Sequence, residues 1–335
     1  MEYRILGRTG VEVSCLALGC MNFGGKTNES DSFAIIDRAL ADGINFLDTS
    51  NSYNHFQSEV VTGNALARDN KRQQVVLATK FSIPLGKGPN MGGASRRFII
   101  EQCEQSLRRL RTDHIDLYQI HRPHPKIPID ETLRALDDLV RSGKVRYLGT
   151  STFAAWQIVE ALWVSEKYLL NRFISEQPPY SIVERRAERE LIPMAQTYGT
   201  AIIPWSPLAA GLLTGKYGRN KTAPEDSRYL TWPGAPLEKA RWVEPLYDAL
   251  EQLEPMAAEK GCTLSQLALA WCLHQPGVTS PIVGPRTLEQ YLDNLGALTV
   301  DISADDRKRI DRIVQRGSVI VPYYEADFGP HPHRV

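Results

Sequence analysis

The chain has 335 residues, of which 42% are hydrophobic and 23% are charged, as in ordinary soluble globular proteins. Lysine plus arginine and aspartate plus glutamate each number 39, so the formal net charge is zero and nothing in it favours nucleic acid or an anionic membrane. No apolar run approaches the roughly 18 residues needed to span a bilayer.

The chain begins with a predicted β-hairpin over residues 4–13, around a glycine-containing turn. Behind it, apolar strand-like runs alternate with longer amphipathic segments. Several of these runs are nearly continuous, which is typical of strands covered on both faces. The eight predicted strands are about 15–20, 44–48, 75–80, 115–120, 145–150, 173–177, 201–205 and 279–283.

Helices are predicted between the strands. Ser30 is expected to cap a helix that starts at Asp31, and Ser95 to cap a long helix that reaches Leu110. Another helix is predicted from about Asp130 to Ser142, before Gly143. Further helices are predicted near 154–167, 186–198, 264–274 and 287–295.

Strand–helix alternation repeated eight times predicts a parallel (β/α)8 barrel. A doubly wound open sheet is the alternative, but no G-x-G-x-x-G segment follows the first strand, which weakens it. With no linker and no low-complexity segment in view, residues 1–335 are interpreted as a single domain.

Two stretches exceed this repeat. Residues 217–262 are predicted to form a long loop after the seventh strand and then an extra helix from Leu237 to Lys260. A second extra helix is predicted over residues 303–316, with Ser303 as its cap. Residues 317–335 are predicted to form an irregular C-terminal tail.

The cysteines and the first residues of the chain indicate in which cellular compartment the protein is expected. Since the cysteines are odd in number, scattered and without metal-ligand spacing, reduced thiols and no metal site are expected. The first residues lack the apolar core of a signal peptide, so a cytoplasmic protein is expected. The five cysteines are Cys15, Cys20, Cys103, Cys262 and Cys272.

Polar residues stand directly behind three predicted strands. These residues are Asp48, Lys80 and His121, and Tyr53 follows Asp48 in a loop. Each alone is more often a cap, a rim charge or a packing residue. Because parallel α/β folds carry their chemistry at the carboxyl ends of their strands, the combination predicts one site.

These four side chains suit proton donation. A free phenol has a pKa near 10 and is a poor acid at pH 7, but a neighbouring ammonium stabilises the phenolate. Lys80 could supply that charge, Asp48 could hold Lys80, and His121 could bond a substrate oxygen or tune the phenol. Carbonyl reduction needs such a set, because its oxygen becomes negative during the reaction. A lyase or aldolase that uses Lys80 as a Schiff-base nucleophile is an alternative.

Three segments resemble motifs of the aldo-keto reductase family: residues 43–53, with Glu59 and Gly63 downstream, 77–80 and 116–121. The resemblance covers nearly the whole chain. It implies NADP(H)-dependent, reversible reduction of an aldehyde or ketone, with Tyr53 as proton donor and Lys80, Asp48 and His121 as the other catalytic residues.

The resemblance also implies a cofactor site for NADPH or NADP+ that lies across the barrel without a Rossmann fold. Ser151 and Gln177 would hold the nicotinamide amide, while Thr152 stands where the family often has Asn or Arg. Trp205 would stack on the nicotinamide. The pyrophosphate and the long loop around it would use Ser206, Leu208, Gly211, Lys216 and Arg228.

The adenosine half would lie at the start of the helix near 287–295. The resemblance assigns Gly284, Arg286, Gln290 and Asn294 to it, and a helix N-terminus independently suits an anion. The charge and plane of Arg286 suit a 2′-phosphate and adenine, so NADP is favoured over NAD. Phe23 and Trp232 are expected to line the substrate pocket.

A non-enzymatic role is the main alternative. Potassium-channel β subunits resemble this family, bind NADPH and serve as regulatory subunits of a partner. They carry Asn where this chain has His121, and the histidine therefore favours chemistry. The substrate, the preferred direction and the choice between monomer and homo-oligomer stay open.

Overall fold

The computed structural model describes residues 1–321 except 223, 226 and 228–242. Arg228, Trp232, the first part of the predicted helix 237–260 and the tail after residue 321 lie outside the described residues. None of the described helices is both long enough and apolar enough to cross a membrane.

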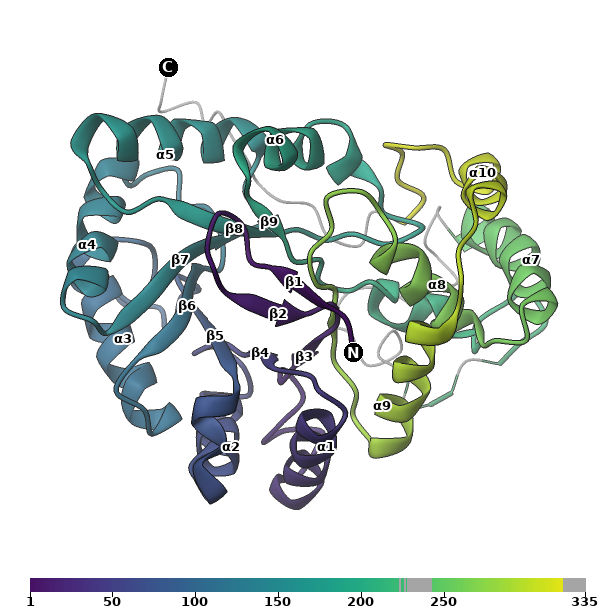
Figure 1. Ribbon diagram of the computed structural model, residues 1–335, viewed down its shortest axis with the longest axis horizontal. Coiled ribbons are helices and arrows are strands. Elements are labelled where there is room, and N and C mark those ends of the chain that lie inside the picture. Colours follow the sequence, from purple (N-terminus) through teal and green to yellow (C-terminus); the bar gives the residue numbers. More distant parts are fainter. Residues whose placement is uncertain (223, 226, 228–242, 322–335) are drawn as a thin grey trace.

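Eight parallel strands form one sheet in the described residues, and Figure 1 shows β3 to β9 side by side in it. Neighbours pair in the order β10-β3-β4-β5-β6-β7-β8-β9. The sheet closes because β9 and β10 and the residues next to them are joined by backbone hydrogen bonds, from Thr279 N to Ile202 O and from Ile282 N to Pro204 O, both 2.8 Å. The predicted (β/α)8 barrel is therefore confirmed. Its strands are β3 (Ala17–Gly19), β4 (Phe46–Asp48), β5 (Val76–Phe81), β6 (Ile115–Ile120), β7 (Val145–Ser151), β8 (Phe173–Gln177), β9 (Ala201–Ile202) and β10 (Ile282–Val283).

The predicted hairpin is confirmed as β1 (Tyr3–Ile5) and β2 (Glu12–Ser14), which pair antiparallel. It crosses the barrel in Figure 1, and the fully buried Leu6 and Val13 join the core cluster formed by inward-facing strand residues. The hairpin approaches the strands closely, since a Cβ on Gly7 would lie 2.3 Å from Ile174 O. The hairpin thus covers the amino-terminal end of the barrel and does not cover the end where the strands finish.

Helices surround the sheet, and the two predicted extra helices are confirmed as α7 (Val243–Glu259) and α10 (Ala304–Ile313). Ser95 and Ser303 accept the capping hydrogen bonds expected of them. The other α-helices of the described residues are α1 (Glu29–Ala41), α2 (Gln57–Leu66), α3 (Arg96–Leu110), α4 (Ile129–Arg141), α5 (Ala155–Tyr168), α6 (Leu191–Tyr198), α8 (Leu264–Leu273) and α9 (Leu288–Leu295).

Two helix starts differ from the prediction. Helix α1 begins at Glu29, and its cap is Asn28, whose side chain accepts from Asp31 N at 2.9 Å, so Ser30 lies inside the helix. The segment predicted as one helix over 186–198 is a short 3-10 helix, Arg186–Glu188, followed by α6. Asn28 and Ser30 are both residue types that cap helices, and the sequence alone does not show which of them caps α1.

Helix α2 was not predicted. Its sequence places β-branched residues and Gly63 in the middle, which lowers intrinsic helix propensity. Packing holds it instead: buried Glu59 accepts from Thr79 Oγ1 at 2.6 Å and pairs with Arg109 Nε at 2.6 Å. Helix α2 is thereby tied to both β5 and α3, and it anchors the loop that carries Tyr53.

The close packing of Gly63 predicts that a larger residue at this position lowers the free energy of unfolding. A Cβ there would lie 2.4 Å from Arg109 O and 2.7 Å from Leu110 Cα, which are backbone atoms. We expect Gly63→Ala to lower the free energy of unfolding by about 1–3 kcal/mol, because the clash outweighs the gain of about 1 kcal/mol in helix propensity.

Urea unfolding measures this effect. Gly10→Ala is the matched control, since a Cβ at Gly10 meets nothing within 4 Å. Equal stability of Gly63→Ala and the parent protein would show that α2 does not need this close contact.

Candidate functional site

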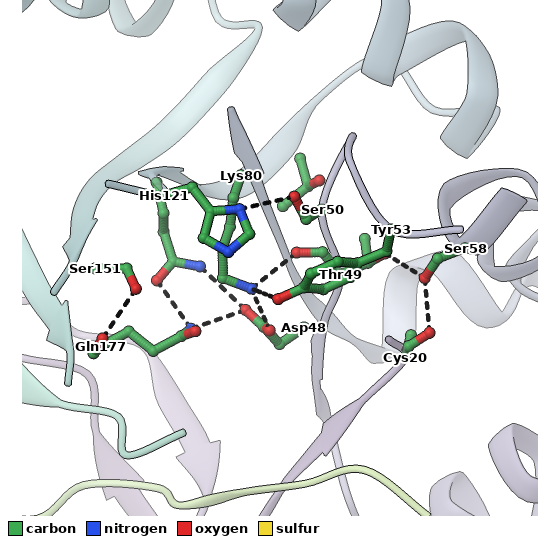
Figure 2. Close-up of polar contacts among 12 residues, drawn as sticks. Cys20, Asp48, Thr49, Ser50, Tyr53, Ser58, Lys80, His121, Ser151 and Gln177 are labelled. Atoms are coloured by element: carbon green, nitrogen blue, oxygen red, sulfur yellow. Dashed lines mark hydrogen bonds and ion pairs between the residues drawn. The ribbon is translucent and has the colours of Figure 1, made fainter. Parts of the chain in front are cut away.

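The structure brings the four predicted catalytic residues together at the carboxyl end of the barrel (Figure 2). Asp48 is the last residue of β4, Lys80 lies in β5, and His121 follows β6 directly. Because β4 pairs with β5 and β5 with β6, these residues are neighbours across the sheet. Tyr53 reaches them from the loop between β4 and α2.

Lys80 is the centre of the cluster, and its side chain is fully buried. Its Nζ donates to Asp48 Oδ2 at 2.5 Å, to the carbonyl oxygen of Thr49 at 3.0 Å and to the hydroxyl of Tyr53 at 3.4 Å. Three acceptors match the three hydrogens of an ammonium group.

Lys80 stays charged in spite of its burial. Burial disfavours the ammonium, but the Asp48 carboxylate and the Tyr53 hydroxyl together outweigh it and raise the pKa of Lys80 above its ordinary value. The side chain is therefore a permanent positive charge next to the phenol at neutral pH.

Asp48 is held from its other side by two amides. Its Oδ1 accepts from Gln119 Nε2 at 3.1 Å and from Gln177 Nε2 at 3.0 Å. Gln177 Nε2 also lies 3.3 Å from Gln119 Oε1. Residues of β6 and β8 thus fix the carboxylate that holds Lys80.

Tyr53 lies in a loop of unusual backbone conformation. The three residues after it, Asn54, His55 and Phe56, all have positive φ angles, which side-chain-bearing residues rarely adopt. Asn54 Nδ2 ties the loop to Met21 O at 2.8 Å. The Tyr53 ring meets the ring of His121 edge-on, with centroids 5.5 Å apart.

His121 is neutral in this setting. Burial, followed by the positive charges of Lys80 and Arg122, lowers its pKa well below the ordinary value. Its Nδ1 lies 3.1 Å from Ser50 Oγ, which leaves Nε2 as the other polar atom of the ring. A neutral imidazole can donate or accept a hydrogen bond, but it is not a cationic acid.

The residues predicted to hold a nicotinamide amide lie beside this cluster. Ser151 Oγ donates to the carbonyl oxygen of Gln177 at 2.9 Å, and Thr152 follows with a φ of 59°. Gln177 donates through Nε2, and its Oε1 receives no hydrogen bond from the described residues. The Gln177 Oε1 and the lone pairs of Ser151 fit a primary amide, which presents N–H donors.

The next predicted segment has an unusual backbone conformation. Leu208 has a φ of −94°, and Ala209, Ala210 and Gly211 have positive φ angles. Ala209 N donates to Ser206 O at 2.8 Å and Gly211 N to Leu208 O at 2.9 Å, so the turn is held by its own backbone. A Cβ on Gly211 would lie 3.4 Å from Lys216 Nζ, so the ammonium is adjacent.

The other predicted residues of this segment are Trp205 and Ser206. Ser206 has a φ of 53°. The guanidinium of Arg122 lies over the Trp205 ring at 5.6 Å. Arg122 thus reaches from the loop after His121 to the segment after β9.

The predicted adenosine site lies at the start of α9. The N-cap of α9 is Thr287, and Arg286 N donates to Gln290 Oε1 at 2.9 Å. The preceding loop is held from the first barrel loop by Asn22 Nδ2 on Gly284 O and by Thr27 Oγ1 on Arg286 O, both 2.9 Å. The side chain of Asn294 is buried on α9.

Two residues, Phe23 and Trp232, were predicted to line the substrate pocket. Phe23 is fully buried within the main core, so its role as a substrate contact stays a prediction. Trp232 and the cofactor candidate Arg228 lie outside the described residues.

Three buried polar residues around the site were not singled out from the sequence: Ser50, Gln119 and Glu176. Glu176 Oε2 accepts from Thr150 Oγ1 at 2.5 Å, and its Oε1 accepts from Phe153 N at 3.1 Å, so it braces the loop after β7. Gln119 and Glu176 each stand inside a predicted strand, and a polar residue within an apolar run was the available signal.

The buried lysine–carboxylate–phenol cluster lies at the carboxyl end of a (β/α)8 barrel, where barrel enzymes carry their active sites. A family model described as the aldo/keto reductase family matches residues 15–315, and the chain belongs to that family. Family membership supports NAD(P)-dependent carbonyl reduction as its general chemistry.

Relatives of the chain match it over most of its length. An uncharacterized oxidoreductase, YrpG, of Bacillus subtilis (strain 168) is 40% identical over 93% of this chain and 96% of its own. Probable voltage-gated potassium channel β subunits of Oryza sativa subsp. japonica and Arabidopsis thaliana are 38% and 36% identical. Both cover 90% of this chain and 92% of their own.

The burial of Glu176 should make the free energy of unfolding depend on pH. Burial raises the pKa of its carboxyl from 4.5 to about 8, so between these values the folded protein holds a proton that the unfolded chain has lost. The free energy of unfolding must then fall as pH rises through this window, by on the order of a few kcal/mol. Glu176→Gln lacks this titration, so the stability of the variant relative to the parent should rise from pH 5 to pH 8.

Urea unfolding at several pH values tests this expectation. Glu160→Gln, on an exposed position of α5, is the control and should keep a constant difference from the parent. A difference for Glu176→Gln that does not change with pH would contradict the assignment.

Proposed function

We propose that the protein is an NADPH-dependent carbonyl reductase that acts reversibly on an aldehyde or ketone, with Tyr53 as the proton donor. The observation that carries the proposal is the 3.4 Å contact between the Tyr53 hydroxyl and the ammonium of Lys80. A phenol held against a buried, permanently charged ammonium suits donation of a proton to a developing alkoxide.

Each of the four residues has one task in this proposal. Nicotinamide, when bound, supplies a hydride for the carbonyl carbon. Tyr53 gives its hydroxyl proton to the carbonyl oxygen, and the charge of Lys80 stabilises the phenolate that remains. Asp48 keeps Lys80 charged and in place, and neutral His121 donates a hydrogen bond that orients the carbonyl. The reverse reaction, alcohol oxidation, uses the same groups.

In this proposal the cofactor would be held by residues that follow strands β7 to β10. Ser151 and Gln177 would bind the nicotinamide amide, with Trp205 against the ring. The left-handed backbone from Ala209 to Gly211, with Leu208, Ser206 and Lys216, would face the pyrophosphate. Arg286, Gln290 and Asn294 would bind the adenosine half, with Arg286 favouring the 2′-phosphate of NADP.

The Schiff-base alternative is disfavoured by the geometry. A nucleophilic amine must be accessible and deprotonated. Lys80 is fully buried, its hydrogens are directed at three acceptors, and its pKa is raised. These observations describe a structural cation, not a nucleophile.

A regulatory subunit with little turnover is the second candidate, because the relatives from rice and Arabidopsis are named as probable channel β subunits. The neutral histidine packed against Tyr53 favours chemistry. Steady-state turnover on a panel of aldehydes and ketones would support the enzyme. Absent turnover, together with one stoichiometric membrane partner in a pull-down from native extract, would support the subunit.

Tyr53→Phe tests the proton donor. We expect a loss of kcat of at least about 100- to 10,000-fold, because general acid catalysis contributes this much, while NADPH binding is nearly unchanged. Turnover is followed at the absorbance of NADPH, and binding by quenching of its fluorescence. Tyr147→Phe is the control, since Tyr147 packs against the core near the hairpin. Near-normal turnover of Tyr53→Phe would refute the assignment.

Arg286→Met tests the cofactor preference. Loss of charge-assisted bonds to a phosphate should weaken NADPH binding roughly 10- to 100-fold and leave NADH binding almost unchanged. Both dissociation constants are measured on the same preparations, and Lys308→Met on α10 serves as a charge-matched control. An equal effect on the two cofactors would show that Arg286 does not read the 2′-phosphate.

A further inference from the structure

Helix α5 carries a cluster of exposed aromatic and apolar side chains. It lies in the outer layer of helices, between α4 and α6 (Figure 1). Of the eleven large hydrophobic side chains that are exposed among the described residues, four belong to α5 or to the residue after it: Trp156, Trp163, Tyr168 and Leu169. Trp163 is 61% exposed and Leu169 is 83% exposed. Such a cluster on one helix is typical of a surface that binds another protein.

Two charged residues lie in the same stripe of α5 as the tryptophans. Residues 156, 160, 163 and 167 follow one another at intervals of four, three and four, so they line one face of the helix, and all four are exposed. In chain order the stripe consists of Trp156, Glu160, Trp163 and Lys167. A negative charge therefore stands on one side of Trp163 and a positive charge on the other.

These two charges do not pair with each other, because seven residues of α-helix separate them by about 10 Å along the axis. Helix residues three or four apart can pair, as Arg134 does with Asp130 on α4. Within the part of the chain that the structure describes, neither Glu160 nor Lys167 has an ion pair. Lys167 Nζ instead lies 5.1 Å from the centre of the Trp163 ring, so the ammonium is held over the exposed aromatic surface.

A second copy of the same helix would be complementary to this stripe. Glu160 stands three residues before Trp163, and Lys167 stands four residues after it. A two-fold axis beside Trp163 therefore places each Glu160 opposite Lys167 of the other copy and brings the two Trp163 rings together. The same axis places Trp156 near the exposed Leu169 of the other copy. A partner surface of a single charge sign would not match, because the stripe presents both signs.

We propose that α5 is a self-association surface, on which a second copy of this chain docks antiparallel across Trp163. The tryptophans would supply the apolar contact at the centre of the interface. The two Glu160–Lys167 pairs would fix the antiparallel orientation. The proposal does not depend on the proposed function, because none of these residues belongs to the candidate site.

Sedimentation equilibrium of the full-length protein over a range of concentrations tests the association. We expect a reversible assembly of at least two copies. Trp163→Ala should raise its dissociation constant by about 30-fold or more, because a central aromatic residue carries much of the binding energy of an interface. Leu292→Ala, at a position of α9 that is 40% exposed, is the control and should leave the association unchanged. A parent protein that is monomeric at every concentration would overturn the proposal and leave the cluster to a partner of different sequence.

Charge reversal tests the antiparallel pairing itself. Glu160→Lys and Lys167→Glu each place like charges opposite one another, so each variant alone should associate at least about 10-fold more weakly than the parent. An equimolar mixture of the two variants should associate like the parent, because each lysine of one variant then faces a glutamate of the other. Lys308→Glu, on an exposed position of α10, makes the same change of net charge and should have no effect.

The mixture separates pairing from a merely structural role of these residues. A variant weakened by misfolding would not recover on mixing, and far-UV circular dichroism and urea unfolding show whether each variant is folded. If one reversal does not fold, Trp163→Ala and the other reversal decide the matter. Two folded reversal variants that do not recover on mixing would overturn the proposal. Association that none of the α5 substitutions weakens would overturn it as well.

Discussion

The ion pair between Lys80 and Asp48 is the constraint on which the rest of the site depends. A charge that is fully removed from water is stable only with a well-placed partner and with its remaining hydrogens satisfied. The barrel meets this need by giving neighbouring strands one member each, while the Thr49 carbonyl oxygen and the Tyr53 hydroxyl complete the ammonium. The Tyr53 hydroxyl is therefore held beside Lys80 because it is one of the three acceptors that the buried ammonium needs.

The same cluster keeps one group charged and its neighbour neutral. Lys80 retains its proton because a carboxylate faces it, and its positive charge helps burial to hold His121 in the neutral form. Two amides from β6 and β8 occupy the other oxygen of Asp48, so the carboxylate is directed towards Lys80. Burial and neighbouring charges, and not residue type alone, thus decide which titratable groups of the site are charged and which are neutral.

Much of the fold and of the proposed site could be predicted because both depend on patterns that are local in the chain. Apolar runs mark strands, and a polar residue at the end of a run marks the chemical face, which is how Asp48, Lys80 and His121 were found. Gln119 and Glu176 stand inside such runs, so only their polar character marked them in the sequence, and the atoms they contact belong to other strands and loops. Helix α2 escaped for a related reason: its stability comes from the contacts of Glu59 with β5 and α3 and not from its own propensity.

The way the barrel closes has a consequence for the newly made chain. Strand β3 pairs on one side with β10, through Ala17 and Ile282, so its second edge has no partner until nearly the whole chain has left the ribosome. At about 5–20 residues per second, synthesis of the intervening segment takes on the order of tens of seconds. During that interval an open strand edge invites pairing with other nascent chains. Production of this protein should accordingly benefit from slower expression or from chaperones that shield an amino-terminal strand.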